Sequence, residues 1–268
     1  MKKRILLLLT ATLFTACNVT VDKQPLGYVP DYKNVKVDQV LNKKEFLIGY
    51  SYAAKGAIYV SYTITKEQVN TKNIRQRPYF YKETNIPKEY RVLPEDYIHA
   101  MSSNCIMGRV DRGHLAPDAD FDYNQTVLNK TYSMANISPQ LSILNRGYWA
   151  DAEKRERYLA NKYNKVFVVN IVQYNQNILM VKEPIDNIDI SNWTQKQIDN
   201  YKKYSKQLLE KHILIPTNYY KKINYKKEGY TFSECYKLPN NYAILKNAQL
   251  ERTLLMEFEI PCEEVPSL

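Results

Sequence analysis

One stretch of the chain gathers side chains that could act together on a phosphodiester bond. The tetrapeptide Asp111–His114 supplies an arginine and a histidine, and Asn145 and Glu153 follow further along the chain. An imidazole can take a proton from water, and a guanidinium can offset the charge of a transferring phosphoryl group. An amide oxygen and a carboxylate suit a hard, hydrated cation. Together these residues indicate metal-assisted phosphodiester hydrolysis.

A predicted strand and a predicted helix must position these residues. Asp111 to His114 closes a strand, in which Gly113 permits a backbone geometry that a bulkier residue would resist. Apolar spacing predicts a helix after Asn145, and on a wheel of 100° per residue Asn145 and Glu153 are about 80° apart. We therefore expect both side chains to face one pocket from a single helix.

The remaining pattern predicts a mixed architecture. Two runs rich in β-branched and aromatic residues, 46–52 and 57–64, form an antiparallel hairpin, and 166–172 is a buried strand. Residues 194–211 are an amphipathic helix with a capping box at Thr194 and Gln197. Further strands are expected at 213–216 and 219–225, a final helix at 248–258, and loops at 78–106 and 176–190. This mixture favours the α+β class, with a mainly antiparallel sheet and helices.

Composition narrows the class of partner. The chain has 268 residues, a net charge of +10 and a sequence pI of about 9.2. A basic balance favours polyanions, which are nucleic acid or anionic lipid, through long-range attraction. The 24 tyrosines and 7 glycines fit either base stacking or a compositional bias of the genome.

The amino terminus resembles a bacterial export signal that ends in a lipobox. A cationic start is followed by the short apolar run 5–13 and by Cys17. This resemblance implies a signal peptide at 1–16, a diacylglycerol anchor on Cys17 and a tether at 17–44. The protein would then face the periplasm or the cell surface from a membrane. Phe14 departs from the usual aliphatic residue, so ordinary signal-peptidase cleavage is the alternative.

Cysteine usage predicts at most one disulfide. After lipidation, Cys105, Cys235 and Cys262 remain in an oxidising compartment. We expect Cys235 to pair with Cys262, because both lie in the carboxy-terminal part, and Cys105 to be free. The spacing of cysteines and histidines does not match a zinc site.

Three blocks carry a family resemblance. They are Asp111–Pro117, Asn136–Gln140, and Asn145 to Glu153 with glycine and tryptophan at 147 and 149. In order and spacing they resemble the DNA/RNA non-specific endonuclease family of ββα-metal nucleases. The resemblance implies a ββα-metal (His-Me finger) motif in a domain spanning 45–268, with a helical insertion at 183–211.

The resemblance also implies roles for the central residues. His114 matches the general base that activates water. Asn145 matches the single protein ligand of Mg²⁺, with Mn²⁺ compatible, although without the resemblance it would be read as a helix cap. Glu153 matches the helix carboxylate that holds metal-bound water.

Arginines and supporting residues complete the implied site. Arg112 matches a guanidinium that shapes the site, and Arg77 matches the arginine that stabilises the transition state. Arg75 is the close contender for that role. Asn136 and Gln140 are expected to hold the loop by hydrogen bonds, and Asp111 to orient the strand or Arg112.

The resulting hypothesis is a sugar-non-specific endonuclease. It would cut DNA and RNA with water activated by His114, leave 5′-phosphorylated ends, and contact mainly backbone phosphates. One alternative is a surface lipoprotein that binds nucleic acid without cleaving it. Two others are an exported effector or toxin and a phosphodiesterase for small or lipid substrates.

Overall fold

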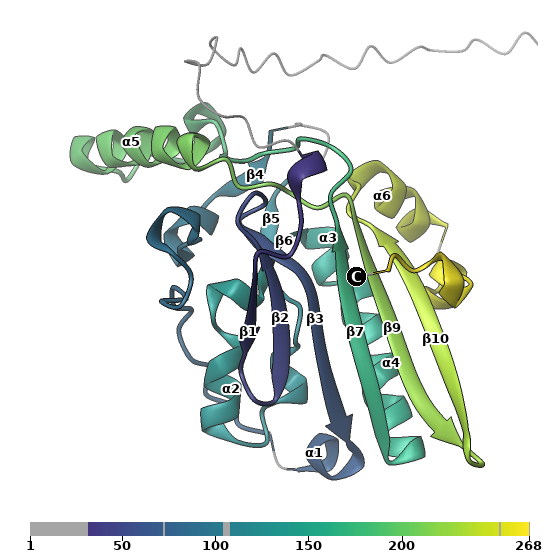
Figure 1. Cartoon of the computed structure of the whole chain (residues 1–268). Helices are drawn as coiled ribbons and strands as arrows, with labels where there is room; N and C mark the ends of the chain where they lie inside the picture. Colours follow the sequence, from purple (N-terminus) through teal and green to yellow (C-terminus); the bar gives the residue numbers. More distant parts are fainter. Residues whose placement is uncertain (1–31, 72, 104–107, 252, 268) are drawn as a thin grey trace, which may run out of the picture.

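A six-stranded antiparallel sheet is the core of the protein. The computed structural model describes residues 32–267 except 72, 104–107 and 252. The strand order is β1-β2-β3-β7-β9-β10, and every neighbouring pair is antiparallel (Figure 1). The strands are β1 (Gln39–Asn42), β2 (Phe46–Ser51), β3 (Gly56–Thr65), β7 (Lys165–Gln173), β9 (Asn218–Lys227) and β10 (Tyr230–Pro239).

Strand β7 lies in the interior of this sheet and positions helix α4 next to the site. Val166 and Val168 are buried, whereas Phe167 between them is 46% exposed, because alternate side chains of a strand point to opposite faces. Helix α4 (Tyr148–Tyr163) packs against β7 and β9 with buried Trp149 and Leu159 (Figure 1). The predicted buried strand at 166–172 is confirmed.

Two short sheets lie outside the main one. Strands β5 (Val110–His114) and β6 (Ile137–Leu141) pair antiparallel, and α3 (Ser142–Asn145) follows β6 directly. Strand β4 (Ala100–Ser102) pairs with β8 (Met180–Lys182). The chain therefore contains a strand pair followed by helices at the position where the sequence predicted the site.

The other helices connect and cover these strands. The α-helices are α1 (Lys66–Asn70), α2 (Gln125–Thr131), α5 (Gln195–Lys211) and α6 (Tyr242–Leu250). The short 3₁₀ helices are η1 (Tyr32–Asn34), η2 (Lys88–Tyr90), η3 (Pro94–Tyr97), η4 (Asp118–Asp120), η5 (Met134–Asn136), η6 (Ile185–Asn187), η7 (Leu255–Phe258) and η8 (Cys262–Glu264). Helix α5 packs beside β8 and projects beyond the end of the main sheet (Figure 1). Among the residues described, no helix combines the length and apolarity needed to cross a bilayer.

Several predicted elements are confirmed. The hairpin of β2 and β3 is antiparallel. Helix α5 begins at a capping box in which Thr194 and Gln197 satisfy each other's backbone N–H groups. Cys235 and Cys262 form a disulfide with a Cα–Cα distance of 5.3 Å. The predicted free Cys105 lies outside the described residues, as do the predicted signal peptide, Cys17 and the first part of the tether.

Several predicted boundaries are wrong. Residues 213–216 form no strand beyond a single bridge of Leu214 to Leu179, and the predicted loops 78–106 and 176–190 contain β4 and β8. Gln39–Asn42, which the sequence assigns to the tether, forms edge strand β1. Because only Leu41 of this strand is buried, the strand lacks the alternation of apolar and polar residues that would have predicted it. The final helix is α6, not 248–258, because the Asn241 side chain accepts from the Ile244 N–H and starts the helix early. Asn145 and Glu153 do not share one helix, because Gly147, with φ −110° and ψ −111°, separates α3 from α4.

Candidate active site

The pairing of β5 with β6 depends on a close approach at Gly113. A Cβ atom at this position would lie 2.1 Å from Oε1 of Gln140, which is closer than any real contact. Gln140 is fully buried, and its Nε2 and Oε1 atoms have no hydrogen-bond partner within the described chain. Its predicted role as a hydrogen-bonded support is therefore not what the geometry shows, and it instead fills the space that Gly113 leaves.

Asn136 anchors the segment that follows the strand. Its Oδ1 accepts from the Ala116 N–H at 2.8 Å, and its Nδ2 donates to the carbonyls of Ala116 and Thr131, both at 2.9 Å. The side chain is fully buried, so these bonds replace the water that a buried amide would otherwise need. The expectation that Asn136 holds this loop by hydrogen bonds is met.

His114 ends β5 between two aromatic rings. Its ring centroid lies 5.5 Å from that of Phe80 and 4.9 Å from that of Tyr132. The backbone carbonyl of His114 accepts a 3.1 Å hydrogen bond from the indole N–H of Trp149, which ties β5 to α4. Nε2 is buried and has no hydrogen-bond partner among the described residues. A ring nitrogen is thus left for a molecule that the protein itself does not supply.

The surroundings keep the His114 imidazole neutral. Burial lowers its pKa to about 4, because a charged ring loses hydration; the Asp118 carboxylate opposes this shift and the Arg77 guanidinium adds to it. At neutral pH the ring is therefore unprotonated and can accept a proton from water.

Asp118 and Arg77 form a charged cluster beside the imidazole. Arg77 Nη2 lies 2.9 Å from Asp122 Oδ2, and its Nε lies 3.5 Å from Asp118 Oδ2. Asp118 Oδ2 also accepts a 2.8 Å hydrogen bond from the Tyr132 hydroxyl. Sequence reasoning missed Asp118, Asp122 and Tyr132. The one available signal was that Asp118 follows His114 by four residues. Both Arg75 and Arg77 are exposed, but of the two only Arg77 forms ion pairs with Asp118 and Asp122.

Arg112 occupies the other side of Phe80. Its guanidinium carbon lies 5.1 Å from the Phe80 ring centroid, and Nη2 donates to the Pro94 carbonyl at 2.8 Å. Nε is buried without a hydrogen-bond partner in the described part of the chain. Side chains two residues apart on a strand lie on the same face, so Arg112 and His114 lie on one face of β5. Both contact Phe80 there.

Asn145 is oriented by Asp111. Its Nδ2 donates to Asp111 Oδ2 at 3.1 Å, which leaves the amide oxygen as the atom that can bind a cation. Asp111 also accepts from Ser142 and twice from Arg146. Burial would raise the pKa of Asp111, but these hydrogen bonds outweigh it and the pKa is lowered. Asp111 therefore stays ionised and holds the Asn145 amide, whereas the sequence predicts that it orients the strand or Arg112.

Glu153 faces a buried, charged interior from α4. Burial raises its pKa to about 8; Lys221 and Arg157 lower it, whereas Glu156 and Asp118 raise it further. Asp118 therefore acts on both His114 and Glu153, which places these two predicted residues in one electrostatic environment. A bound cation would favour the ionised form of Glu153.

A buried ion pair supports this helix from behind. Lys221 and Glu156 are both fully buried and form a salt bridge, and Tyr62 donates to Glu156 Oε1 at 2.9 Å. The Lys221 ammonium also lies 4.7 Å from the Trp149 ring centroid. Removing one partner of such a pair leaves an uncompensated charge, so the pair fixes the position of α4. Nothing in the local sequence marks Lys221 as buried.

The donor set decides what kind of metal the site could hold. Among the described residues, no three His, Cys, Asp or Glu side chains lie together as a metal cluster. The Asn145 amide oxygen and the Glu153 carboxyl fit a cation that keeps most of its water shell. Mg²⁺ usually binds in this way, because it loses its bound water reluctantly.

Comparison with known proteins agrees with this arrangement. A model of the family described as DNA/RNA non-specific endonuclease matches residues 28–265. The mitochondrial nuclease of Saccharomyces cerevisiae is 32% identical over 153 residues, which are 56% of this chain and 43% of that protein. Mitochondrial endonuclease G of Homo sapiens is 25% identical over 142 residues, 53% of this chain and 45% of that protein. The matched part thus spans less than half the length of each relative.

The fold has a counterpart among solved structures. A chain from the crystal structure of the EndoG/EndoGI complex aligns with a TM-score of 0.64 and 19% identity, covering 88% of this chain and 86% of that one. At this identity the likeness concerns the fold, and it supports a mixed α+β architecture with a mainly antiparallel sheet.

Proposed function

The chain belongs to the DNA/RNA non-specific endonuclease family, and from this premise we propose that it hydrolyses internal phosphodiester bonds of DNA and RNA. The observation that carries the proposal is the buried Nε2 of His114, which has no partner in the described residues and whose ring is held neutral by burial. A neutral, unsatisfied imidazole near the Arg77 guanidinium has the properties of a base that acts next to a phosphate.

His114 and the arginines perform the protein's part of the reaction. His114 Nε2 accepts a proton from the attacking water, and the resulting hydroxide attacks phosphorus in line with the leaving 3′ oxygen. Arg112 lies beside the imidazole across Phe80, and its unpaired Nε can donate to a phosphate oxygen. Arg77 is held by Asp118 and Asp122 and adds positive potential where negative charge develops. The products carry 5′-phosphates.

The metal would be held at Asn145. We assign its amide oxygen as the protein ligand and Glu153 as the carboxylate that holds a water of the ion. When bound, Mg²⁺ or Mn²⁺ supplies Lewis-acid stabilisation of charge on the leaving oxygen. Asp111 keeps the Asn145 amide turned so that its oxygen is the coordinating atom.

The substrate range and location extend this proposal. Contacts from Arg112, Arg77 and a hydrated cation to phosphates carry no base information, so both DNA and RNA of any sequence are expected substrates. The predicted signal at 1–16 and lipid anchor on Cys17 would place the enzyme on a membrane, facing the periplasm or cell surface.

Digestion of circular single-stranded DNA tests the function. Circles offer no ends, so their conversion to fragments shows endonucleolytic cleavage. We expect cleavage with Mg²⁺, loss of cleavage with EDTA, and loss in His114→Ala with retained oligonucleotide binding and unchanged thermal unfolding. Full activity of His114→Ala would remove this residue from the mechanism. Binding without cleavage by the wild type would instead support the nucleic-acid-binding lipoprotein.

A further inference from the structure

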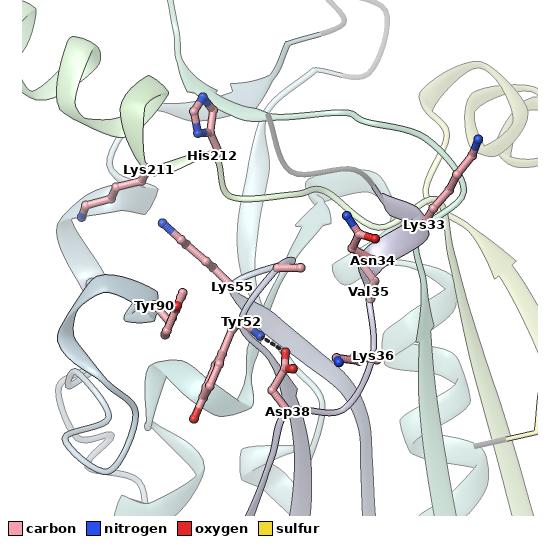
Figure 2. Close-up of a pocket in the computed structure, with 11 residues that line it drawn as sticks. Lys33, Asn34, Val35, Lys36, Asp38, Tyr52, Lys55, Tyr90, Lys211 and His212 are labelled. Carbon is pink, nitrogen blue, oxygen red and sulfur yellow. Dashed lines mark hydrogen bonds between the residues drawn. The ribbon is translucent and has the colours of Figure 1, made fainter. Parts of the chain in front are cut away.

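A basic pocket lies away from the candidate active site, between η1, the turn joining β2 to β3, and the carboxy-terminal end of α5 (Figure 2). Its volume is about 630 Å³. Lys36, Lys55 and Lys211 reach it from these three parts of the chain. Among its described lining residues Asp38 is the one acid, and its Oδ2 already accepts from the Tyr52 N–H at 2.7 Å. The pocket therefore carries a net positive charge.

The cations of this pocket repel one another. Burial lowers the pKa of the Lys55 ammonium, and the charge of Lys211 lowers it further. The pKa of His212 is lowered likewise, first by burial and then by Lys55. Lys211 is held in place by its salt bridge to Asp96. An anion bound among these groups would relieve the repulsion.

Two residues that line the pocket have a left-handed backbone conformation although they are not glycine. Lys55 and His212 both have φ of 51°, in the left-handed region where a glycine would be less strained. His212 is the residue that caps α5, a position that glycine usually fills. Side chains kept at such positions are candidates for ligand binding.

An aromatic wall accompanies the cations. Tyr52 and Tyr90 line the pocket and stack with ring centroids 4.3 Å apart and planes inclined by 4°. Tyr52 is fixed further by a 2.9 Å hydrogen bond from its hydroxyl to Gln39. Ammonium groups beside a flat aromatic surface are the combination that binds phosphates and bases of a single strand.

A second pocket shares Lys211 with the basic pocket. Its volume is about 510 Å³, and its lining includes Phe80, Pro94, Tyr204 and Lys211. Phe80 is the ring that His114 and Arg112 both contact. The second pocket therefore lies between Phe80, which His114 contacts, and the end of α5, where Lys211 borders the basic pocket.

We propose that the basic pocket binds a backbone phosphate of the substrate strand several nucleotides from the scissile bond, with α5 as the wall that guides the strand. The inference rests on the proposed function for its substrate, but the binding step does not require cleavage. The group that the pocket binds is a phosphate, and this phosphate belongs to the backbone of the substrate strand.

The test compares strand lengths in the full chain carrying His114→Ala, so that binding is read without cleavage. Single-stranded DNAs of about 20 and about four nucleotides are titrated by fluorescence anisotropy. With Lys36→Glu and Lys55→Glu together, we expect affinity for the longer strand to fall about ten-fold more than affinity for the shorter one. The slope of log affinity against log salt should become shallower by about 1.4, the value for two lost contacts to a single strand.

A matched control reverses two charges elsewhere. Lys226 and Lys227 lie exposed at the end of β9 that is remote from the pocket (Figure 1), and their double change to Glu should preserve the length dependence and the salt slope. An equal loss for both strands, or no loss, overturns the proposal. A second outcome also overturns the proposal. In it, the wild-type pocket binds inorganic phosphate or anionic phospholipid vesicles saturably, the pocket variant loses this binding, and its affinity for DNA shows no length-dependent loss. If the length-dependent loss is found but the wild type never cleaves, the proposed function fails and the pocket assignment stands.

Discussion

The carboxamide of Asn145 donates a 3.1 Å hydrogen bond through Nδ2 to Oδ2 of Asp111. This contact joins α3 to β5 and determines which atom of the amide is left for a cation. Asp111 Oδ2 also accepts from Arg146, but the Arg146 side chain is 74% exposed. The two partners of Asp111 therefore differ in what they can contribute to the site.

Asp111→Ala should raise the Mg²⁺ concentration needed for half-maximal cleavage by about 10- to 100-fold, because Asn145 would lose the acceptor that orients it. Arg146→Gln removes an exposed ion pair, worth about 0–1 kcal/mol, and should leave that concentration nearly unchanged. Cleavage rates over a Mg²⁺ titration, with thermal unfolding of each variant, make the comparison. Equal metal dependence in the two variants would show that Asp111 does not position Asn145.

The depressed pKa of His114 predicts how activity depends on pH. Because the imidazole must be neutral to act as a base, activity is lost as pH falls through the folded-state pKa. Burial lowers that pKa from 6.5 to about 4. At saturating Mg²⁺, which favours the ionised form of Glu153, we therefore expect kcat/KM to hold from neutral pH down to well below 6.5 and to fall near pH 4. The measurement uses a short oligonucleotide in buffers of constant ionic strength. A half-maximal point at 6.5 or higher would contradict the burial of Nε2.

Arg77→Gln should shift this acidic limb in a defined direction. The Arg77 guanidinium lowers the pKa of His114, so its removal raises that pKa and moves the limb to higher pH. The maximal rate should fall as well, since positive potential near the phosphate is lost. Arg75→Gln is the matched control, because Arg75 is exposed like Arg77 but forms no ion pair with Asp118 or Asp122, and it should leave the limb in place. A larger shift with Arg75→Gln would reverse the assignment between the two arginines.

The sequence predicts those parts of the site whose roles are local. The tetrapeptide ending at His114, its strand and the capping box at Thr194 all depend on neighbours a few residues away. The break between Asn145 and Glu153 was missed, because helical periodicity continues through Gly147 although the backbone does not. Wheel angles are valid only within one unbroken helix.

Long-range packing supplies the rest of the site. Phe80, Asp118 and Tyr132 reach His114 from loops and from the end of α2, and their own segments carry no sign of this meeting. The pairing of Lys221 with Glu156 spans 65 residues. In sequence, both residues look like ordinary solvated charges, and only the packing of α4 on β9 buries them.

Removing the disulfide should destabilise the fold. The bond closes a loop of 27 residues between Cys235 and Cys262, which corresponds to about 3.5 kcal/mol of lost unfolded-state entropy. Cys235→Ala combined with Cys262→Ala should therefore lower Tm by roughly 10 °C for a domain of this size. Reduction of the wild-type protein should have a similar effect, and reductant should not change the Tm of the double variant. A reductant-insensitive wild type would show that this bond does not form.

Gly113→Ala should be harmful because of Gln140, and the partner offers a way to demonstrate it. The added methyl would overlap Oε1 of Gln140 at 2.1 Å, and the fully buried Gln140 side chain cannot move into solvent. Such overpacking costs about 1–3 kcal/mol and would displace the strand that carries His114, so both Tm and cleavage should fall. Gln140→Ala removes the obstructing atoms. If the clash is the cause, the double variant Gly113→Ala with Gln140→Ala recovers part of the loss that Gly113→Ala alone produces. Losses that simply add in the double variant would instead mean that β5 needs the backbone freedom of glycine at this position, whatever lies opposite.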